Sequence, residues 1–180
     1  MVKLAILQPR DRPFPSFDGF GTGADRLRPA LALIEPDIAG NVGTILRLSA
    51  CFGVDAHIVE PCGFAFSDRA LRRAGMDYAM AANVVRHATR SQFLAQAAAQ
   101  GRRLLLLTTS GETSLYEARL DPGDILMFGS ESGGAPDDVH DAAALRLRIP
   151  LRAGFRSLNV AVAAGIALAE LLRQTGQMPA

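Results

Sequence analysis

The sequence predicts an α/β protein in which a parallel sheet is covered by helices on both faces. Two observations carry this prediction. Short strand patterns alternate with helical patterns from Leu31 to Arg173, and this alternation is typical of parallel sheets. Several of the strands, such as Leu104–Thr108 and Ile125–Phe128, carry unbroken apolar runs, as expected for strands that are buried on both sides.

Each element follows from its local pattern. Strands are expected at short apolar runs, and helices where apolar residues recur every three or four positions. Pro150 cannot donate to a strand ladder, so the last strand should end there. The expected strands are Leu31–Glu35, Ala56–Glu60, Val84–Val85, Leu104–Thr108, Ile125–Phe128 and Leu145–Ile149, and the expected helices are Thr44–Phe52, a basic helix after Ser67, one after Ser91, Pro136–Ala144 and Ser157–Arg173.

The last helix is the most apolar of these elements. Between Val160 and Ala169 every face is apolar or small, so the helix should be buried on several sides. The hydroxyl of Ser157 is expected to cap its first turn. Arg156, Ser157 and Asn159 cluster at this start, where they form either a cap or a site.

Length and composition indicate one domain with a preceding arm. The chain has 180 residues and a net charge of +1, so no global field recruits nucleic acid. Residues 1–29 are rich in Pro, Gly and charge, and we expect a mobile arm there, followed by a single domain over 30–180. Gly19, Gly21 and Gly23 do not have dinucleotide-binding spacing, and no apolar strand precedes them.

Cysteine, histidine and hydropathy patterns favour a cytoplasmic protein without a metal or membrane segment. Cys51 and Cys62 lie in apolar segments without disulfide spacing, which predicts core thiols in a reducing compartment. His57 and His87 are expected at a strand end and on the surface, and the histidine spacing indicates no metal site. No apolar run reaches the roughly 18 residues that span a bilayer, and no signal-peptide pattern opens the chain.

Asn41, Gly43 and Arg47 form the first motif, at a strand-to-helix turn. A helix start offers free amides and a positive dipole end, and Arg can bind a phosphate through two hydrogen bonds. This arrangement suits an anion. The alternative is that Asn41 only caps the helix and Arg47 is a solvated surface residue.

Gly129, Glu131, Gly133 and Gly134 form the second motif, directly after an apolar strand. Ligands of open parallel sheets bind at the loops that leave the carboxyl ends of strands, and glycine lets the backbone approach a ligand closely. The alternative is a plain Gly-rich turn.

Together the motifs resemble those of the SpoU branch of the SPOUT RNA methyltransferases. The order is N-x-G-x-x-x-R, F-G-x-E-x-x-G and I-P-x(6)-S-L-N-V. The stretches HIVEPCGFAF and LRRAGMDY are similar to those of the members that methylate the ribose of the tRNA wobble nucleotide. The resemblance extends from Leu31 to Arg173.

The resemblance implies a C-terminal deep trefoil knot, S-adenosylmethionine as cofactor without a metal, and a homodimer. It implies cofactor contacts at Leu107, Gly129, Ile149 and Ser157, a catalytic role for Arg47, and supporting polar roles for Asn41, Glu131 and Asn159. Two positions depart from the family pattern. Gly133 stands where relatives often carry Arg, and Ala161 where a second serine is common.

The expected RNA contacts are arginines. Arg69, Arg72 and Arg73 share one basic helix, and Arg152 and Arg156 flank the third motif; the alternative for the helix is a solvated face. Phosphate contacts of this kind set affinity, and the wobble base of an anticodon loop is unstacked enough to enter a pocket.

The resemblance implies 2'-O-methylation at position 34, on cytidine and modified uridine of leucine tRNAs. The alternatives are another tRNA or rRNA ribose, or a noncatalytic RNA-binding relative. A dinucleotide-dependent oxidoreductase is disfavoured, because the sequence lacks the required Gly fingerprint after its first strand.

Overall fold

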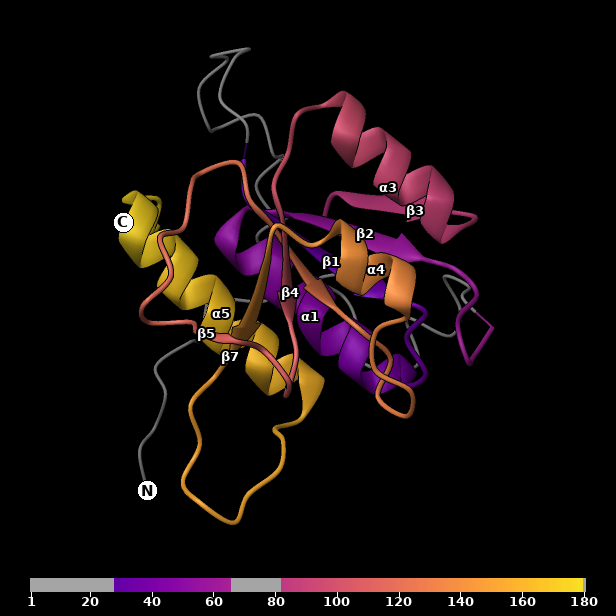
Figure 1. Ribbon diagram of the computed structural model, residues 1–180. Helices are drawn as coiled ribbons and strands as arrows, with labels where there is room; N and C mark the ends of the chain where they lie inside the picture. The colour runs from indigo at the N-terminus through magenta and orange to yellow at the C-terminus, as the bar shows by residue number, and fades with distance from the viewer. Residues whose placement is uncertain (1–27, 66–81, 180) are drawn as a thin grey trace, which may run out of the picture.

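The computed structural model describes residues 28–65 and 82–179. Within them lies a seven-stranded sheet of order β3-β2-β1-β6-β4-β7-β5 (Figure 1), and every pair of neighbouring strands is parallel. The predicted fold class is confirmed. The strands are β1 Ala30–Ile34, β2 Asp55–Val59, β3 Val84–His87, β4 Leu104–Leu107, β5 Thr113–Ser114, β6 Ile125–Phe128 and β7 Leu145–Arg148.

Four helices of the described residues cover the sheet, two on each face (Figure 1). They are α1 Ala39–Phe52, α3 Arg90–Ala99, α4 Asp137–Ala142 and α5 Val160–Thr175. Alternating residues of β1 divide between two cores, since successive side chains of a strand point to opposite faces. Leu31 and Leu33 pack with α1 and α5, whereas Ala32 and Ile34 pack with α3 and α4.

The strand order locates the functional end of the sheet. Strand β1 pairs with β2 on one side and with β6 on the other, so the chain changes direction across the sheet between β1 and β6. Loops leaving the carboxyl ends of these two strands therefore border a common crevice, the usual ligand site of open parallel sheets.

Three helix starts differ from the predicted ones. Helix α1 begins at Ala39 and not at Thr44, and no side chain caps it. Helix α5 begins at Val160 and is capped by Asn159 and not by Ser157. Helix α3 begins after Thr89, whose side chain accepts from the amide of Gln92. Sequence patterns locate such ends poorly because neighbouring Ser, Thr and Asn residues can all serve as caps.

The two-residue strand β5 was not predicted. Thr113 and Ser114 carry no apolar pattern, and they form a strand because they pair with Leu147 and Arg148 of β7. The predicted burial of α5 is only partly correct. Ala164, Leu168 and residues at similar spacing are buried, but Val162 is 51% exposed.

The predicted environments of Cys51, His57 and His87 are wrong. Cys51 is exposed, and Cys62 is half-buried with a pKa raised to about 11, mainly by burial. His57 and His87 are buried between β2, β3 and α3, where Nδ1 of His57 lies 2.9 Å from Nε2 of His87. Burial is the main cause that lowers the pKa of His57 to about 4. Phe93 packs against both rings.

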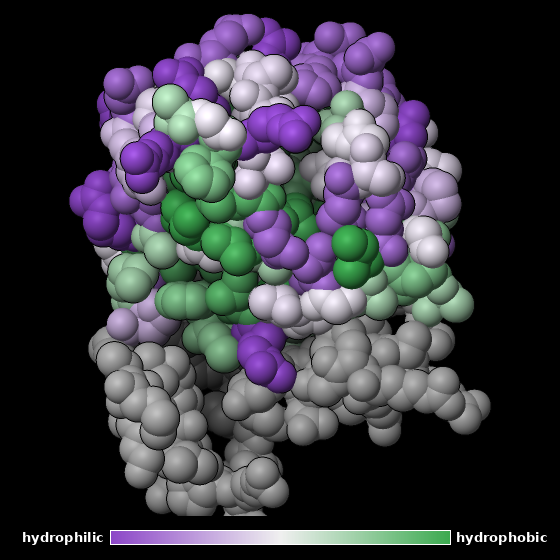
Figure 2. All heavy atoms as spheres, turned by 90° about the horizontal axis from the view of Figure 1, so that it is seen from below, coloured by the Kyte–Doolittle hydropathy of each residue, from purple (hydrophilic) through white to green (hydrophobic). Residues whose placement is uncertain are grey.

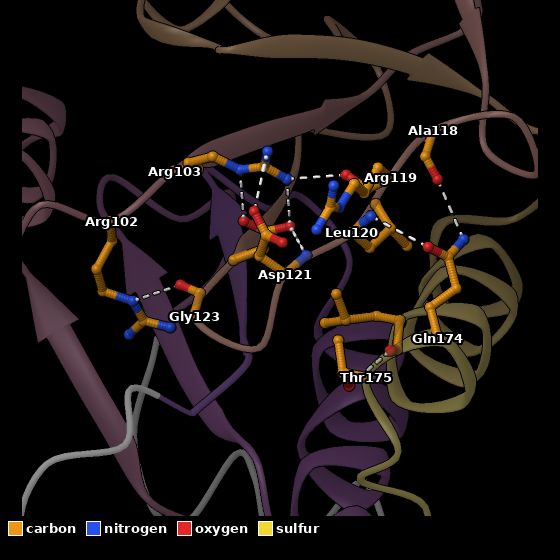
Figure 3. A network of polar contacts seen from close by, with 11 residues as sticks. Arg102, Arg103, Ala118, Arg119, Leu120, Asp121, Gly123, Gln174 and Thr175 are labelled. Carbon is orange, nitrogen blue, oxygen red and sulfur yellow. Dashed lines mark hydrogen bonds and ion pairs between the residues drawn. The ribbon is translucent and has the colours of Figure 1, made fainter.

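A polar network, which we call the amino-end clamp, joins Arg103, Arg119, Asp121, Asp124 and Gln174 near the amino ends of β4 and β6. Figure 3 labels Arg103, Arg119, Asp121 and Gln174 of this network. Arg103 donates to both carboxylate oxygens of the buried Asp124, at 2.9 and 2.8 Å, and to the carbonyl of Arg119 at 3.0 Å. Gln174 of α5 accepts from the amide of Leu120 and donates to the carbonyl of Ala118, both at 3.1 Å. The clamp thus ties the loop before β6 to β4 and α5.

Candidate active site

The carboxyl ends of the strands surround a cavity of about 1010 Å³. This is the upper end of the roughly 300–1,000 Å³ range of small-molecule sites, so the cavity has room for a cofactor and part of a second substrate. Figure 2 shows this end from below, with apolar residues gathered near the centre and hydrophilic ones around them. The wall comprises Ile38, Asn41, Leu107–Thr109, Phe128–Ala135, Leu147–Leu151, Phe155–Val160 and Ala163.

Asn41, Glu131 and Asn159 form a chain of hydrogen bonds along this wall, which we call the polar relay. Asn159 Nδ2 donates to Asn41 Oδ1 at 2.9 Å, and Asn41 Nδ2 donates to Glu131 Oε1 at 2.7 Å. The second oxygen of Glu131 accepts from the backbone amide of Asp37 at 2.8 Å. The relay therefore joins the loops that follow β1, β6 and β7.

The direction of the relay follows from the cap of α5. The backbone amides of Ala161 and Val162 can only donate, and they do so to Asn159 Oδ1, at 2.8 and 3.4 Å. The amide nitrogen of Asn159 must then face Asn41, which in turn directs its own nitrogen to Glu131. Both oxygens of Glu131 accordingly have donors, an arrangement that suits positioning better than proton abstraction.

Asp37 adds a second link between the same loops. Its Oδ2 accepts from the backbone amide of Ser132 at 3.1 Å and from the Ser132 hydroxyl. These bonds, with the hydroxyl first, lower the pKa of Asp37. Sequence analysis missed both residues, because no spacing signal connects side chains 95 positions apart.

Gly129 has a steric reason to be glycine. A Cβ atom at this position would lie 2.2 Å from the carbonyl carbon of Gly134, far inside van der Waals contact. Ser130 and Gly134 form an isolated antiparallel bridge, and Gly134 has a φ of +71°, a conformation that glycine adopts without strain. The Gly-rich motif is thus a tight loop whose backbone forms part of the cavity wall.

All four residues expected to bind the cofactor line the cavity. They are Leu107, Gly129, Ile149 and Ser157, and they come from the ends of β4, β6 and β7 and from the loop before α5. Arg156 also lines it. Arg152 belongs to the same exposed loop but is not part of the wall.

Arg47 lies apart from this group. It is exposed on α1 and is not among the wall residues, because six helical positions carry it about 9 Å along the axis from Asn41. The alternative that Asn41 caps α1 is wrong, since the helix begins before it. Arg69, Arg72 and Arg73 lie outside the described residues, as does nearly all of the predicted arm.

Neither a metal site nor a membrane span can be identified in the part of the chain that the structure describes. No group of three or more His, Cys, Asp or Glu side chains in residues 28–65 and 82–179 could hold a metal ion. None of the helices in these ranges has the length and apolar character needed to cross a membrane.

The fold and the three motif loops define an RNA methyltransferase of one known family. Residues 28–169 match the SpoU rRNA Methylase family, and the chain belongs to it. The trefoil knot remains an expectation that follows from this family.

Curated relatives narrow the likeness further. The chain is 50% identical over 147 residues to the tRNA (cytidine(34)-2'-O)-methyltransferase of Ancylobacter novellus, covering 82% of this chain and 93% of that protein. It is 41% identical to the enzyme of the same name from Escherichia coli K12, covering 81% and 93%.

Solved structures agree. One described as "Structural insights into the 2-OH methylation of C/U34 on tRNA" is 40% identical, with a TM-score of 0.76 over 82% of this chain and 95% of that one. The AdoMet-bound rRNA methyltransferase of Sinorhizobium meliloti is 27% identical, with a TM-score of 0.72 over 83% and 57%.

Proposed function

We propose that this protein transfers a methyl group from S-adenosylmethionine to the ribose 2'-hydroxyl of nucleotide 34 in tRNA. One observation carries the proposal: residues from three separate motifs meet at one cavity, with the polar relay in its wall. The relatives named above support the address on tRNA. Cytidine, and modified uridine, of leucine tRNAs are the proposed targets.

The wall is chemically suited to S-adenosylmethionine. Leu107 and Ile149 offer apolar surface, the Gly129–Gly134 loop offers backbone groups, and Ser157 offers a hydroxyl; together these are typical of a nucleoside site. These residues would hold the cofactor. When bound, it supplies a methyl group on a sulfonium, which is already electrophilic, so the transfer needs no metal.

The polar relay would keep the cavity in a productive shape. Three loops from different strands must stay in register, because a misplacement of about 1 Å can cost roughly 100-fold in rate. Glu131 accepts from Asp37 in the loop after β1 and from Asn41 in the first turn of α1, and Asn159 both caps α5 and binds Asn41. We assign these three residues to positioning.

Arg47 would bind an RNA phosphate next to the target ribose and so orient the 2'-hydroxyl. A guanidinium stays protonated in proteins and is a poor proton acceptor, so the proton of the 2'-hydroxyl would leave to that phosphate or to water. The position of Arg47 outside the cavity wall suits a contact with the RNA backbone better than one with the cofactor.

Substitutions of Arg47 distinguish a phosphate-binding role from a role as general base. We expect Arg47→Lys to keep more methyl transfer than Arg47→Ala, since a point charge still meets phosphate. Single-turnover rates and tRNA affinity would be measured for both variants. Complete loss of methyl transfer in both variants, with tRNA affinity unchanged, would contradict the phosphate-binding role and favour a specific role in proton transfer.

The assembly and location follow from the same proposal. We propose a homodimer in the cytoplasm that binds the anticodon stem-loop, with Arg69, Arg72, Arg73, Arg152 and Arg156 as phosphate contacts and residues 30–180 as one domain. Ile38 and Val162 are 49% and 51% exposed at the starts of α1 and α5, and a second copy could cover them. Sedimentation at several concentrations tests the dimer, and a single monomeric species would contradict it.

The decisive experiment uses tRNA from cells that lack this protein. After incubation with protein and S-adenosylmethionine, mass spectrometry of anticodon fragments locates new ribose methyl groups. A methyl on nucleotide 34 is the expected result. Methylation elsewhere would contradict the wobble address. No methylation despite binding of cofactor and tRNA would favour a noncatalytic relative, and Gly133→Arg with Ala161→Ser would then test whether these two departures abolish activity.

A further inference from the structure

The loop between β7 and α5 exposes an aromatic ring at the mouth of the cavity. Every residue from Pro150 to Asn159 is exposed, and in Figure 1 this loop extends away from the sheet. Phe155 is 71% exposed, more than any other large hydrophobic side chain of the described residues. It nevertheless lines the cavity. A single exposed apolar side chain is common, so the position of Phe155 at the mouth of the cavity, and not its exposure alone, calls for an explanation.

Phe155 lies in the sequence between two arginines of an exposed turn. The backbone amide of Phe155 donates to the carbonyl of Arg152 at 3.2 Å, which closes a turn. Gly154 within this turn has a φ of +94°, a conformation that other residues adopt only with strain. Arg152 and Arg156, three residues before and one residue after Phe155, are both exposed. The turn therefore carries an exposed aromatic side chain and two exposed arginines, and Phe155 and Arg156 among them line the cavity.

Aromatic rings interleaved with arginines are typical of surfaces that bind unpaired nucleotides. A base stacks on the ring whatever its identity, while the arginines meet the phosphates on either side. A protein partner is less suited to this site, because charged residues are depleted at the centre of protein interfaces. A ring on the rim is also better placed for the larger substrate than for a cofactor held deeper in the wall.

We propose that Phe155 is a stacking platform for an unpaired base of the RNA substrate, at or next to the methylated nucleotide. The inference rests on the proposed function and deepens it, since it names the part of the RNA that this side chain contacts. Arg152 and Arg156 hold the adjacent phosphates. Phe155 thereby contributes to substrate positioning and not to cofactor binding.

Tryptophan at this position reports stacking directly. The sequence contains no tryptophan, so Phe155→Trp introduces a single indole whose fluorescence is quenched when a base stacks on it. The probe is an anticodon stem-loop RNA, compared with versions that lack the base at nucleotide 34 or at either neighbour. Tyr116→Trp is the matched control, because Tyr116 is 57% exposed but does not line the cavity.

The expected result is quenching of Phe155→Trp by the intact RNA, loss of quenching with one of the abasic RNAs, and no quenching of Tyr116→Trp. Quenching by S-adenosylmethionine alone would overturn the inference in favour of a cofactor contact. A blue-shifted emission that depends on protein concentration and ignores RNA would overturn it in favour of self-association. Equal quenching by all four RNAs would also overturn it.

Steady-state kinetics separate positioning from a structural role. We expect Phe155→Ala to raise the KM for tRNA roughly tenfold or more, from the loss of one stacked base, while the KM for S-adenosylmethionine and the melting temperature stay unchanged. Phe155→Tyr should restore the wild-type KM, and Phe155→Leu should not. A rise in the cofactor KM instead would contradict the inference.

The wild-type protein distinguishes the two levels of failure. If it methylates nucleotide 34 but Phe155→Trp is not quenched, the stacking inference is wrong and the proposed function stands. If it methylates no nucleotide of the stem-loop or of whole tRNA, the proposed function is wrong and the stacking inference is overturned with it.

Discussion

The two ends of the sheet both carry polar networks, but the networks differ in charge and in what they enclose. The amino-end clamp is centred on a full ion pair between Arg103 and the buried Asp124, and hydrogen bonding to Asp124 raises the pKa of Arg103. The polar relay is centred on side-chain amides and one carboxylate, and it borders a cavity of about 1010 Å³.

This difference indicates a division of labour. The amino-end clamp joins the loop before β6 to β4 and α5, and none of its residues lines that cavity, so its contacts stabilise the folded state. The polar relay joins the loops of three strands around the cavity, so its hydrogen bonds fix the shape of the site. Variants in the two networks should therefore affect different measurements.

The largest effect is expected from the relay. In Glu131→Gln the new amide group must face either Asn41 Nδ2 or the backbone amide of Asp37, and both are donors. We expect methyl transfer to fall at least about 100-fold, because the loops lose their register, while the melting temperature changes little. Single-turnover kinetics and calorimetry check this. An equal fall in stability would remove the distinction between the two networks.

The clamp should give the opposite pattern. In Asp124→Asn the uncharged side chain no longer balances Arg103, and the Asp124 side chain is only 1% exposed. We expect a loss of about 2 kcal/mol in the free energy of unfolding, below the usual cost of a fully buried pair because Arg103 is partly exposed. Urea unfolding measures it. Asp121→Asn is the milder control, and transfer per folded molecule should stay at the wild-type rate.

A smaller effect is expected from the bond between Asp37 and Ser132. Asp37→Ala removes two hydrogen bonds to Ser132, whereas Ser132→Ala removes only the one from the hydroxyl. Each such bond contributes about 1 kcal/mol, so cofactor affinity should fall more in Asp37→Ala. The double variant should match Asp37→Ala, as measured by calorimetric titration. Additive losses would show that the two side chains act independently.

The smallest effect concerns a third polar contact, between His57 and His87 in the interior, away from both networks. Burial lowers the pKa of both rings, so the unfolded chain binds more protons than the folded one below about pH 6.5. Stability should therefore fall as the pH decreases, by about 0.7 kcal/mol between pH 7 and pH 6 for His57, and level off near its pKa of about 4.

Histidine variants check this pH dependence. Urea unfolding at pH 7 and pH 6 should show a flatter slope for the double variant His57→Leu/His87→Leu than for wild type. His140→Gln, which replaces the remaining histidine of the sequence, should keep the wild-type slope. A change in slope for His140→Gln of the same size would contradict the assignment to the buried pair.

Residues with a strong local pattern were predicted well. The apolar runs at β1, β4 and β6 predicted strands buried on both faces, and the alternation of strands with helices predicted the parallel sheet. The motifs identified six candidate site residues from the sequence, and all six line one cavity. They are Asn41, Gly129, Glu131, Ile149, Ser157 and Asn159. The roles of these residues remain predictions.

Residues whose role depends on distant partners were not predicted well. Asp37 and Ser132 show no common pattern. His57 and His87 were expected at a strand end and on the surface, but both are buried. Thr113 and Ser114 became a strand only through pairing with β7. Each case depends on a contact between segments that are far apart in the sequence.

The sequence alone determined the fold class, the order of the main elements and the family motifs, because periodicity and local residue type act over a few neighbouring positions. Only the tertiary structure decided which residues of the three motifs contact one another. Asn159 caps α5 and also binds Asn41, Glu131 takes donors from two other residues, and Arg47 lies outside the cavity wall. Strand order and helix starts set these distances, and both are fixed by packing across the whole chain.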